Sequence, residues 1–369
     1  MNAFFLDRLN SEPHALAFAG QSTPWPVALA DQSTNPVLDG ELHAHAAAAQ
    51  ALLYPVAADL LATTGRPVDL FGFEANPARL GDAASAAASV PGIALTQLGA
   101  LIDAAELGYN PAKAKPIAVL GHSQGVLAVH MVQAIEQAGS IAAATAQIDE
   151  ILAIATLIGV AGTRQARQLG LAARHGEATP MLSVKDITRA QVDALIARVS
   201  GVHGPIAVAV ANSATHYVLS GYPEDLAAFG VEVAKEHRRQ AKLREEKVRG
   251  GRVFDPVLEY LDVTLPFHSP LMAEAVSQTV SWAQSCGIDA DHARAVQPCG
   301  LGRPCERPDE VHRSECLVGT GLRSRRHRGQ TVLHCGPRYG RRCGGSLHYG
   351  RSRCAVHLGD LTGTHPELD

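Results

Sequence analysis

The sequence predicts an α/β protein with a large part built on a parallel sheet and a smaller part inserted in it. Residues 116–130 have the pattern of a buried strand, a tight turn and an apolar helix, the unit from which parallel sheets are made. Alanine-rich stretches with apolar residues at helical spacing flank this unit. After Pro180 the pattern changes to β-α-β-β-α, with one more strand expected at 263–265. This order is typical of a small ferredoxin-like subdomain.

Composition sets the outer limits. The chain has 369 residues, and its hydrophobic content of 46% is ample for a core. A net charge of −4 gives no whole-chain reason to expect nucleic-acid or membrane binding. The N-terminus lacks the features of a signal peptide, and no stretch approaches about 18 uninterrupted apolar residues, so no transmembrane helix is expected. We therefore expect a cytoplasmic protein.

The elements before the central unit are one strand and two helical regions. Residues 14–20 form a short apolar strand that ends in Gly-Gln, a turn that could present backbone N–H groups and an amide to a site. Helical spacing covers 38–63 and resumes over 83–107, and a loop is expected at 67–77 between them.

The elements after the central unit change character part-way. Residues 126–171 are helical in pattern, with an interruption at Gly139-Ser140. Charges of both signs over 237–252 favour a solvated connection. The elements expected between these regions are a strand at 181–184, a helix at 188–199 capped by Thr188, paired strands at 206–212 and 217–220, and a helix at 223–236.

Ser123 is the candidate nucleophile. It stands between Gly121 and Gly125 in the turn, and Gly-X-Ser-X-Gly between a strand and a helix is the nucleophile elbow, which lifts a serine oxygen above a sheet edge. The glycines permit a sharp bend and a close passage of helix past strand. Free N–H groups at the helix N-terminus favour an oxyanion. An ordinary βα turn that contains serine is the alternative.

His268 is the candidate base, because a serine hydroxyl needs a group that removes its proton and imidazole titrates near neutral pH. Pro266 and Pro270 restrict the backbone on both sides of it. A supporting role suits His122 better, since it adjoins the nucleophile. The histidines that compete for the role of base are His122, His130, His203 and His216.

Seven motifs, in this order, resemble the acyltransferase family of fatty-acid and polyketide synthases: AFAGQ, GHSQG, LIGVAG, PMLSV, VANSATHYVLSG, VRGGRVF and LPFHSP. They look most like the N-terminal acyltransferase domain of bacterial and fungal type I fatty-acid synthases, and the resemblance covers about residues 10–296. It implies an acyltransferase fold with a hydrolase-like core at 1–179 and 244–296 and a ferredoxin-like subdomain at 180–243.

The resemblance also implies roles. Ser123 would be the acylated nucleophile, and His268 the general base, oriented by a backbone carbonyl. Gln21 and the backbone N–H of Gln124 would form the oxyanion hole, and Asn212 would line the site near His268. The implied reaction is acyl transfer from acyl-CoA to the phosphopantetheine thiol of an acyl carrier protein, in fatty acid biosynthesis. No metal and no permanently bound cofactor are implied, and the other synthase domains are expected partners.

Ile158 stands where malonyl-selective members of that family carry an arginine that pairs with the substrate's free carboxylate. An apolar side chain cannot compensate a buried carboxylate, which costs several kcal/mol. We therefore expect a preference for acetyl or another uncharged acyl group, with His122 also near the substrate. The alternative is that Arg164 or Arg167 supplies the charge from the next turn.

Two other functions also fit the sequence. GHSQG also fits an α/β-hydrolase such as a thioesterase or esterase, in which Asp or Glu should lie between the serine and the histidine in the chain. The inserted subdomain and the Gly-Gln turn argue against that fold. The second is an inactive fragment of a truncated synthase.

Residues 297–369 differ from everything before them, with many Arg and His and no Lys. A zinc module, a disulfide domain and a basic nucleic-acid-binding arm fit poorly, because CxxC pairs are absent, the rest looks cytosolic and few aromatic residues are interleaved. We favour an out-of-frame tail from GC-rich coding DNA, without a fold. The cysteines of the chain are Cys286, Cys299, Cys305, Cys316, Cys335, Cys343 and Cys354.

Overall fold

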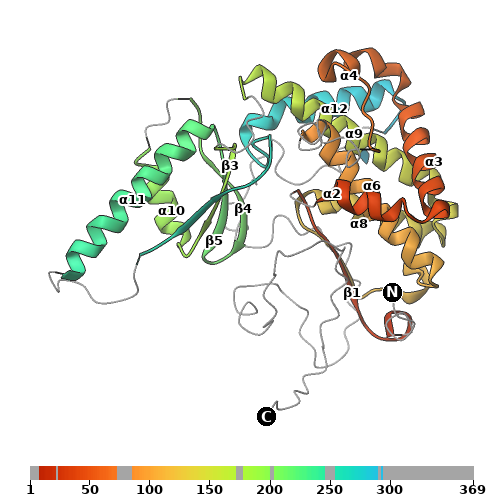
Figure 1. The fold of residues 1–369 in the computed structure, drawn as a ribbon, viewed down its shortest axis with the longest axis horizontal. Helices are drawn as coiled ribbons and strands as arrows, with labels where there is room; N and C mark the ends of the chain where they lie inside the picture. The colour runs from red at the N-terminus through yellow and green to blue at the C-terminus, as the bar shows by residue number, and fades with distance from the viewer. Residues whose placement is uncertain are drawn as a thin grey trace, which may run out of the picture.

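A computed structural model describes the protein over 8–21, 24–72, 85–171, 178–199, 203–245, 254–289 and 292–293. A large, mostly helical subdomain and a small subdomain of strands and helices lie beside each other (Figure 1). The expectations for the tail at 297–369, and for the second half of the loop at 67–77, lie outside the described residues.

The described sheet of the large subdomain is a parallel pair. Strand β1 (Ala15–Phe18) runs beside β2 (Ala118–Gly121), in register from Ala15 opposite Ala118 to Phe18 opposite Gly121. The helices are α2 (Trp25–Gln32), α3 (Pro36–Leu52), α4 (Ala57–Thr64), α6 (Ala86–Glu106), α7 (Pro111–Ala114), α8 (Val126–Ala138), α9 (Thr145–Gln168) and α12 (Ala273–Ser285), with short 3-10 turns η1 (Tyr54–Val56), η3 (Ser123–Gly125), η4 (Ala142–Ala144) and η5 (Pro270–Met272).

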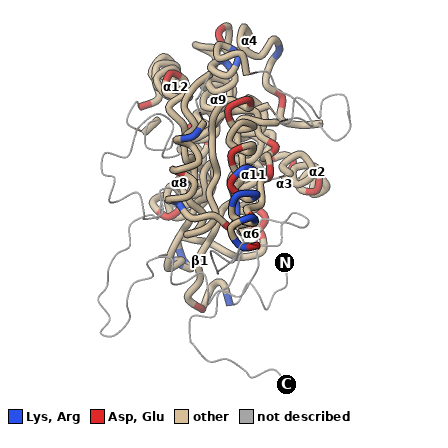
Figure 2. Tube along the Cα trace, turned by 90° about the vertical axis from the view of Figure 1, so that its left-hand side faces the viewer, with Lys and Arg blue, Asp and Glu red and all other residues tan. Residues whose placement is uncertain are grey.

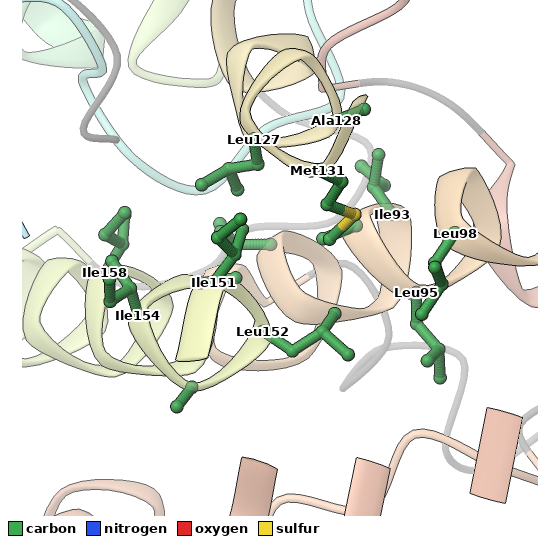
Figure 3. Close-up of a cluster of buried hydrophobic side chains, with 14 of the residues drawn as sticks. Ile93, Leu95, Leu98, Leu127, Ala128, Met131, Ile151, Leu152, Ile154 and Ile158 are labelled. Atoms are coloured by element: carbon green, nitrogen blue, oxygen red, sulfur yellow. The ribbon is translucent and has the colours of Figure 1, made fainter. Parts of the chain in front are cut away.

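Helices α6 and α9 form the centre of the large subdomain. They pack along each other, and α3, α8 and α12 pack on α9. Figure 3 shows Ile93 of α6, Met131 of α8 and Ile151 of α9 pointing into the space between the three helices, as part of one buried apolar cluster. Two helical segments, α6 and Ala142–Gln168 (η4 with α9), are long and apolar enough to cross a membrane by length and composition. Within their apolar windows 89% and 67% of residues are buried inside the protein, so the core accounts for their apolar character.

The small subdomain has the element order β-α-β-β-α-β. Its sheet has the order β4-β5-β3-β6, and all neighbours are antiparallel. A second apolar core, which includes Val184, Leu219 and Phe229, lies between this sheet and its helices. The α/β class with an inserted ferredoxin-like subdomain is thereby confirmed. The elements are β3 (Met181–Lys185), α10 (Arg189–Ile196), β4 (Ala207–Ser213), β5 (His216–Ser220), α11 (Pro223–Glu245) and β6 (Val257–Tyr260).

Two expectations about the end of this subdomain are wrong. No strand forms at 263–265, where Val263 and Leu265 are instead buried in the core of the large subdomain. The last strand is β6, which pairs with β3 and places Tyr260 opposite Leu182. The small subdomain therefore extends beyond the expected boundary at 243, to Tyr260.

Helix α11 is longer than expected. It runs to Glu245 and takes in the first half of the charged segment at 237–252, which was expected to be a connection. Charges at helical spacing explain this extension, because Glu236 accepts hydrogen bonds from Arg239 and Gln240 one turn later. Figure 2 shows charged residues of both signs along α11, whereas the central helices are mostly uncharged.

Candidate active site

The turn after β2 has the geometry of a nucleophile elbow. Strand β2 ends at Gly121, η3 carries Ser123, and α8 starts directly after Gly125. The turn lies against the end of β1: a Cβ atom on Gly125 would lie 2.3 Å from the carbonyl oxygen of Phe18, and one on Gly20 would lie 2.6 Å from that of His122. Only glycine fits at these two points, so the close approach of strand and helix is fixed by sequence.

Backbone strain coincides with the two expected catalytic residues. Among the described residues, four that are not glycine have positive φ, and two of them are Ser123 (φ 52°) and His268 (φ 56°). The left-handed conformation costs an L-residue about 1–2 kcal/mol. Such strain persists where the surrounding structure enforces it, which is typical of functional sites.

The structure brings Ser123 and His268 into direct contact, although 145 residues separate them. The Oγ atom of Ser123 lies 2.8 Å from Nε2 of His268. His268 is 8% exposed and Ser123 is half-buried, so the histidine is shielded from bulk water while the serine stays accessible. Next to it, the Ser269 hydroxyl donates to the carbonyl oxygen of Pro266 at 2.6 Å and closes the turn that carries the histidine. This geometry allows the imidazole to accept the serine proton directly.

Glutamine side chains join the two loops beside the serine. Gln21 Nε2 donates to Gln124 Oε1 at 2.5 Å, and Gln124 Nε2 donates to the carbonyl oxygen of Val90 at 2.6 Å. The Ser89 hydroxyl donates to Gln21 Oε1 at 3.3 Å. Ser89 and Val90 lie in the first turns of α6, and nothing in the sequence distinguished them from other helix residues.

A small pocket opens beside the Ser123–His268 pair. Its apolar wall includes Ile158, which is 4% exposed, and Figure 3 shows Ile158 on α9 pointing toward Leu127 on α8. None of the lining residues is acidic, lysine or arginine. The lining residues are Gln21, Val90, Ser123, Gln124, Leu127, Ile158, Phe267 and His268.

Two expected site residues lie outside this lining. Asn212 of β4 is exposed and its Oδ1 lies 3.1 Å from Nε2 of His122. Asn212 therefore connects the small subdomain to the elbow through His122, the residue next to Ser123. Neither residue lines the pocket at Ser123.

Two competing histidines are engaged elsewhere. His203 Nδ1 faces a carboxylate oxygen of Asp225 at 3.4 Å, and His216 Nε2 lies 3.0 Å from Oγ of Ser183 in the small sheet. Burial lowers the pKa of His216, and the nearby Lys185 lowers that pKa further. His216 and Ser183 form a second serine–histidine contact, but neither lines the pocket.

Arg164 and Arg167, the alternative partners for a substrate carboxylate, make contacts outside the pocket. The Arg164 guanidinium lies over the Trp282 ring, 5.8 Å from its centroid. Arg167 donates to the carbonyl oxygen of Thr63. Neither lines the pocket, so its wall at Ile158 is uncharged.

With this geometry established, comparison with known proteins gives one family match. Residues 180–260 match the family described as "Fatty acid synthase central AT domain". Over this segment the chain is therefore similar to that family. The match coincides with the small subdomain, from the residue before β3 to the end of β6.

Among solved structures, the chain is similar to several transacylases. MCAT from Mycobacterium tuberculosis has 20% identity and a TM-score of 0.49, with 79% of this chain and 82% of that chain covered. The malonyl CoA-acyl carrier protein transacylase from Coxiella burnetii has 17% identity and a TM-score of 0.49, with coverages of 79% and 80%. The corresponding enzyme from Clostridium perfringens has 16% identity and a TM-score of 0.45, with coverages of 74% and 68%.

Proposed function

We propose that this chain transfers an acyl group from acyl-CoA to the phosphopantetheine thiol of an acyl carrier protein through an acyl-serine at Ser123. The observation that carries the proposal is the 2.8 Å contact between Ser123 Oγ and His268 Nε2 at the edge of a small, largely apolar pocket. The fatty acid synthase acyltransferase match of residues 180–260 supports the same reaction class.

The first half-reaction follows from this contact. His268 Nε2 takes the proton as Ser123 Oγ attacks the thioester carbonyl carbon, and the carbonyl oxygen gains the negative charge. N–H groups of Gln21 and the backbone N–H of Gln124 stabilise this oxyanion. The tetrahedral intermediate then collapses, the C–S bond breaks, and the proton on His268 passes to the leaving thiolate of CoA.

The second half-reaction reverses these roles with a new thiol. His268 removes the thiol proton of the carrier protein's phosphopantetheine, and the thiolate attacks the acyl-serine. Collapse of the second intermediate returns the proton to Ser123 Oγ. The kinetics are therefore ping-pong, and no resident cofactor takes part.

The uncharged wall of the pocket favours acetyl over malonyl. A malonyl carboxylate beside Ile158 would lose its hydration and find no arginine or lysine among the lining residues, which costs several kcal/mol. The engagement of Arg164 and Arg167 outside the pocket supports this preference.

Covalent labelling tests the nucleophile. Incubation with radioactive acetyl-CoA should label the full-length chain, and Ser123→Ala should abolish the label. Ser183→Ala is the matched control, because Ser183 also contacts a histidine but lies outside the pocket, and it should keep the label. Label retained in Ser123→Ala would overturn the assignment, and release of acetate far faster than transfer to a carrier protein would favour a thioesterase. A wild-type chain that takes no label would indicate an inactive fragment.

Competition between acyl donors tests the pocket. Ile158→Arg should shift the ratio of acetyl to malonyl labelling toward malonyl, whereas Ile158→Leu, which keeps the wall apolar, should leave the ratio close to wild type. An unchanged ratio in a folded Ile158→Arg variant would contradict the acetyl preference proposed from this wall.

A further inference from the structure

The side chain of Gln124 is buried at the centre of the site, and the mechanism above uses only its backbone N–H. Gln124 is 3% exposed, and its carboxamide makes two short hydrogen bonds, to Gln21 and to Val90. A buried amide satisfied on both sides holds its partners in one arrangement.

The direction of every hydrogen bond in this network is fixed by one carbonyl. The main-chain oxygen of Val90 can only accept, so Gln124 must turn Nε2 toward it and Oε1 toward Gln21. Gln21 must then donate from Nε2 to Gln124, and its own Oε1 accepts from the Ser89 hydroxyl. Neither glutamine can flip its amide without placing two acceptors or two donors face to face.

This fixed direction has a consequence for the pocket. A carboxamide nitrogen carries two hydrogens, and Gln21 Nε2 uses one for Gln124. The second takes no partner in the described part of the chain, and Gln21 lines the pocket together with Ser123 and His268. With the amide reversed, an oxygen would face the developing oxyanion and repel it.

We propose that the Gln124 carboxamide is a positioning residue that, with Ser89, locks the Gln21 amide so that its free N–H serves the oxyanion. This inference rests on the proposed acyl transfer and adds a residue to it. Helix α6 supplies both anchors, the Val90 carbonyl and the Ser89 hydroxyl.

Substitution by methionine separates this role from packing. Gln124→Met keeps the length of the side chain and the backbone N–H but removes both hydrogen bonds. Gln32→Met is the matched control, because Gln32 Nε2 likewise donates to a carbonyl oxygen of α6, that of Thr96 at 2.9 Å, away from the pocket. Melting temperatures of both variants show how much stability each bond contributes.

The decisive measurement is the single-turnover rate of acetyl-Ser123 formation in the full-length chain. Loss of one oxyanion donor costs about 10²–10³-fold in rate, so Gln21→Met should lose about 10²-fold and Gln124→Met about tenfold or more. The KM for acetyl-CoA should stay within about twofold in both, because the oxyanion exists only in the transition state. Gln32→Met should acylate at the wild-type rate.

A double-mutant cycle tests the pathway. If Gln124 acts through Gln21, the Gln21→Met/Gln124→Met double variant is no slower than Gln21→Met alone. If Gln124→Met does not fold, Ser89→Ala replaces it in the test, because it removes the hydrogen bond to Gln21 Oε1. Ser89→Ala should then slow acylation by a similar factor and leave the KM for acetyl-CoA unchanged. Wild-type acylation by a folded Gln124→Met or Ser89→Ala variant, or fully additive effects in the double variant, would overturn the inference. Since Ser123→Ala abolishes labelling in either case, such a result leaves the proposed acyl transfer intact.

Discussion

Gly125→Ala is the substitution that most directly tests how the elbow is built. The added Cβ would lie 2.3 Å from the carbonyl oxygen of Phe18 and 2.9 Å from that of Ala19, both backbone atoms that cannot rotate away. Ordinary contact starts at 3.4 Å, so β1 and the helix must separate by about 1 Å. The same Phe18 oxygen accepts the His122 N–H at 2.9 Å, and this bond must lengthen as well.

This separation should affect both stability and rate. Overpacking of this kind costs about 1–3 kcal/mol of unfolding free energy. The displaced segment continues from Ala19 into Gln21, so the proposed oxyanion donor moves away from Ser123, and a 1 Å displacement in an active site can cost about 10²-fold in rate. We expect a folded Gly125→Ala chain to acetylate Ser123 about 10²-fold more slowly.

Gly40→Ala provides the control for the assay. Gly40 lies in α3 with nothing within 4 Å of an added Cβ, so this change should raise the unfolding free energy by about 0.5–1 kcal/mol and leave acylation unchanged. Urea unfolding and single-turnover labelling on the same preparations separate the two effects. A Gly125→Ala variant with wild-type acylation and stability would refute the argument from close approach.

Three further predictions concern stability, measured by urea unfolding. Asp149 Oδ1 lies 2.5 Å from Nδ1 of His45 and joins α9 to α3. Asp149→Ala leaves the buried His45 without this partner and should lower the unfolding free energy by about 3 kcal/mol. A loss under about 0.5 kcal/mol would contradict this. Hydrogen bonds from Arg239 lower the pKa of Glu236 to about 2. The ionised Glu236 carboxylate therefore stabilises the fold at neutral pH, and this stabilisation is lost as the pH falls from about 4.5 to about 2. Glu236→Gln should flatten the decline in unfolding free energy over this pH range, and an unchanged decline would argue against a stabilising role of the Glu236–Arg239 pair. Thr188→Ala removes the capping box of α10 and should lower the unfolding free energy by about 1 kcal/mol. Thr188→Ser keeps the capping hydroxyl and should have a much smaller effect.

The elbow was predictable because local sequence determines it. A strand, glycines at fixed offsets and an apolar helix specify the turn at Ser123 whatever the rest of the chain does. The prolines around His268 likewise indicated a constrained backbone, which appears as its positive φ. Ser89 and Val90 could not be predicted, because their contribution to the site depends on how α6 docks on the elbow and leaves no periodic signal.

The errors fall where tertiary contacts outweigh local pattern. Residues 263–265 alternate like a strand, but Val263 and Leu265 are buried in the core of the large subdomain without pairing to a sheet. Strand β6 at Val257–Tyr260 has an exposed and a half-buried face and carries Glu259, and no element was expected there from the sequence. It forms because β3 offers it a free edge, with Lys185 opposite Val257.

The small subdomain is inserted between Ser123 and His268 in the chain. The way it is attached explains how two residues so far apart in sequence come into contact. The chain leaves the large subdomain before β3 and returns after β6. Hydrogen bonds join these two connecting segments: the Thr179 hydroxyl donates to the carbonyl oxygen of Leu261 at 2.6 Å, and the Leu261 N–H donates to the carbonyl oxygen of Met181 at 3.0 Å. An insertion whose ends are pinned side by side adds little to the cost of closing the chain, whatever its length. His268 follows soon after the return crossing, so its position depends on this tie and on its proline-bounded turn. Changes inside the small subdomain should therefore leave the 2.8 Å contact in place, whereas loss of the tie at Thr179 should not.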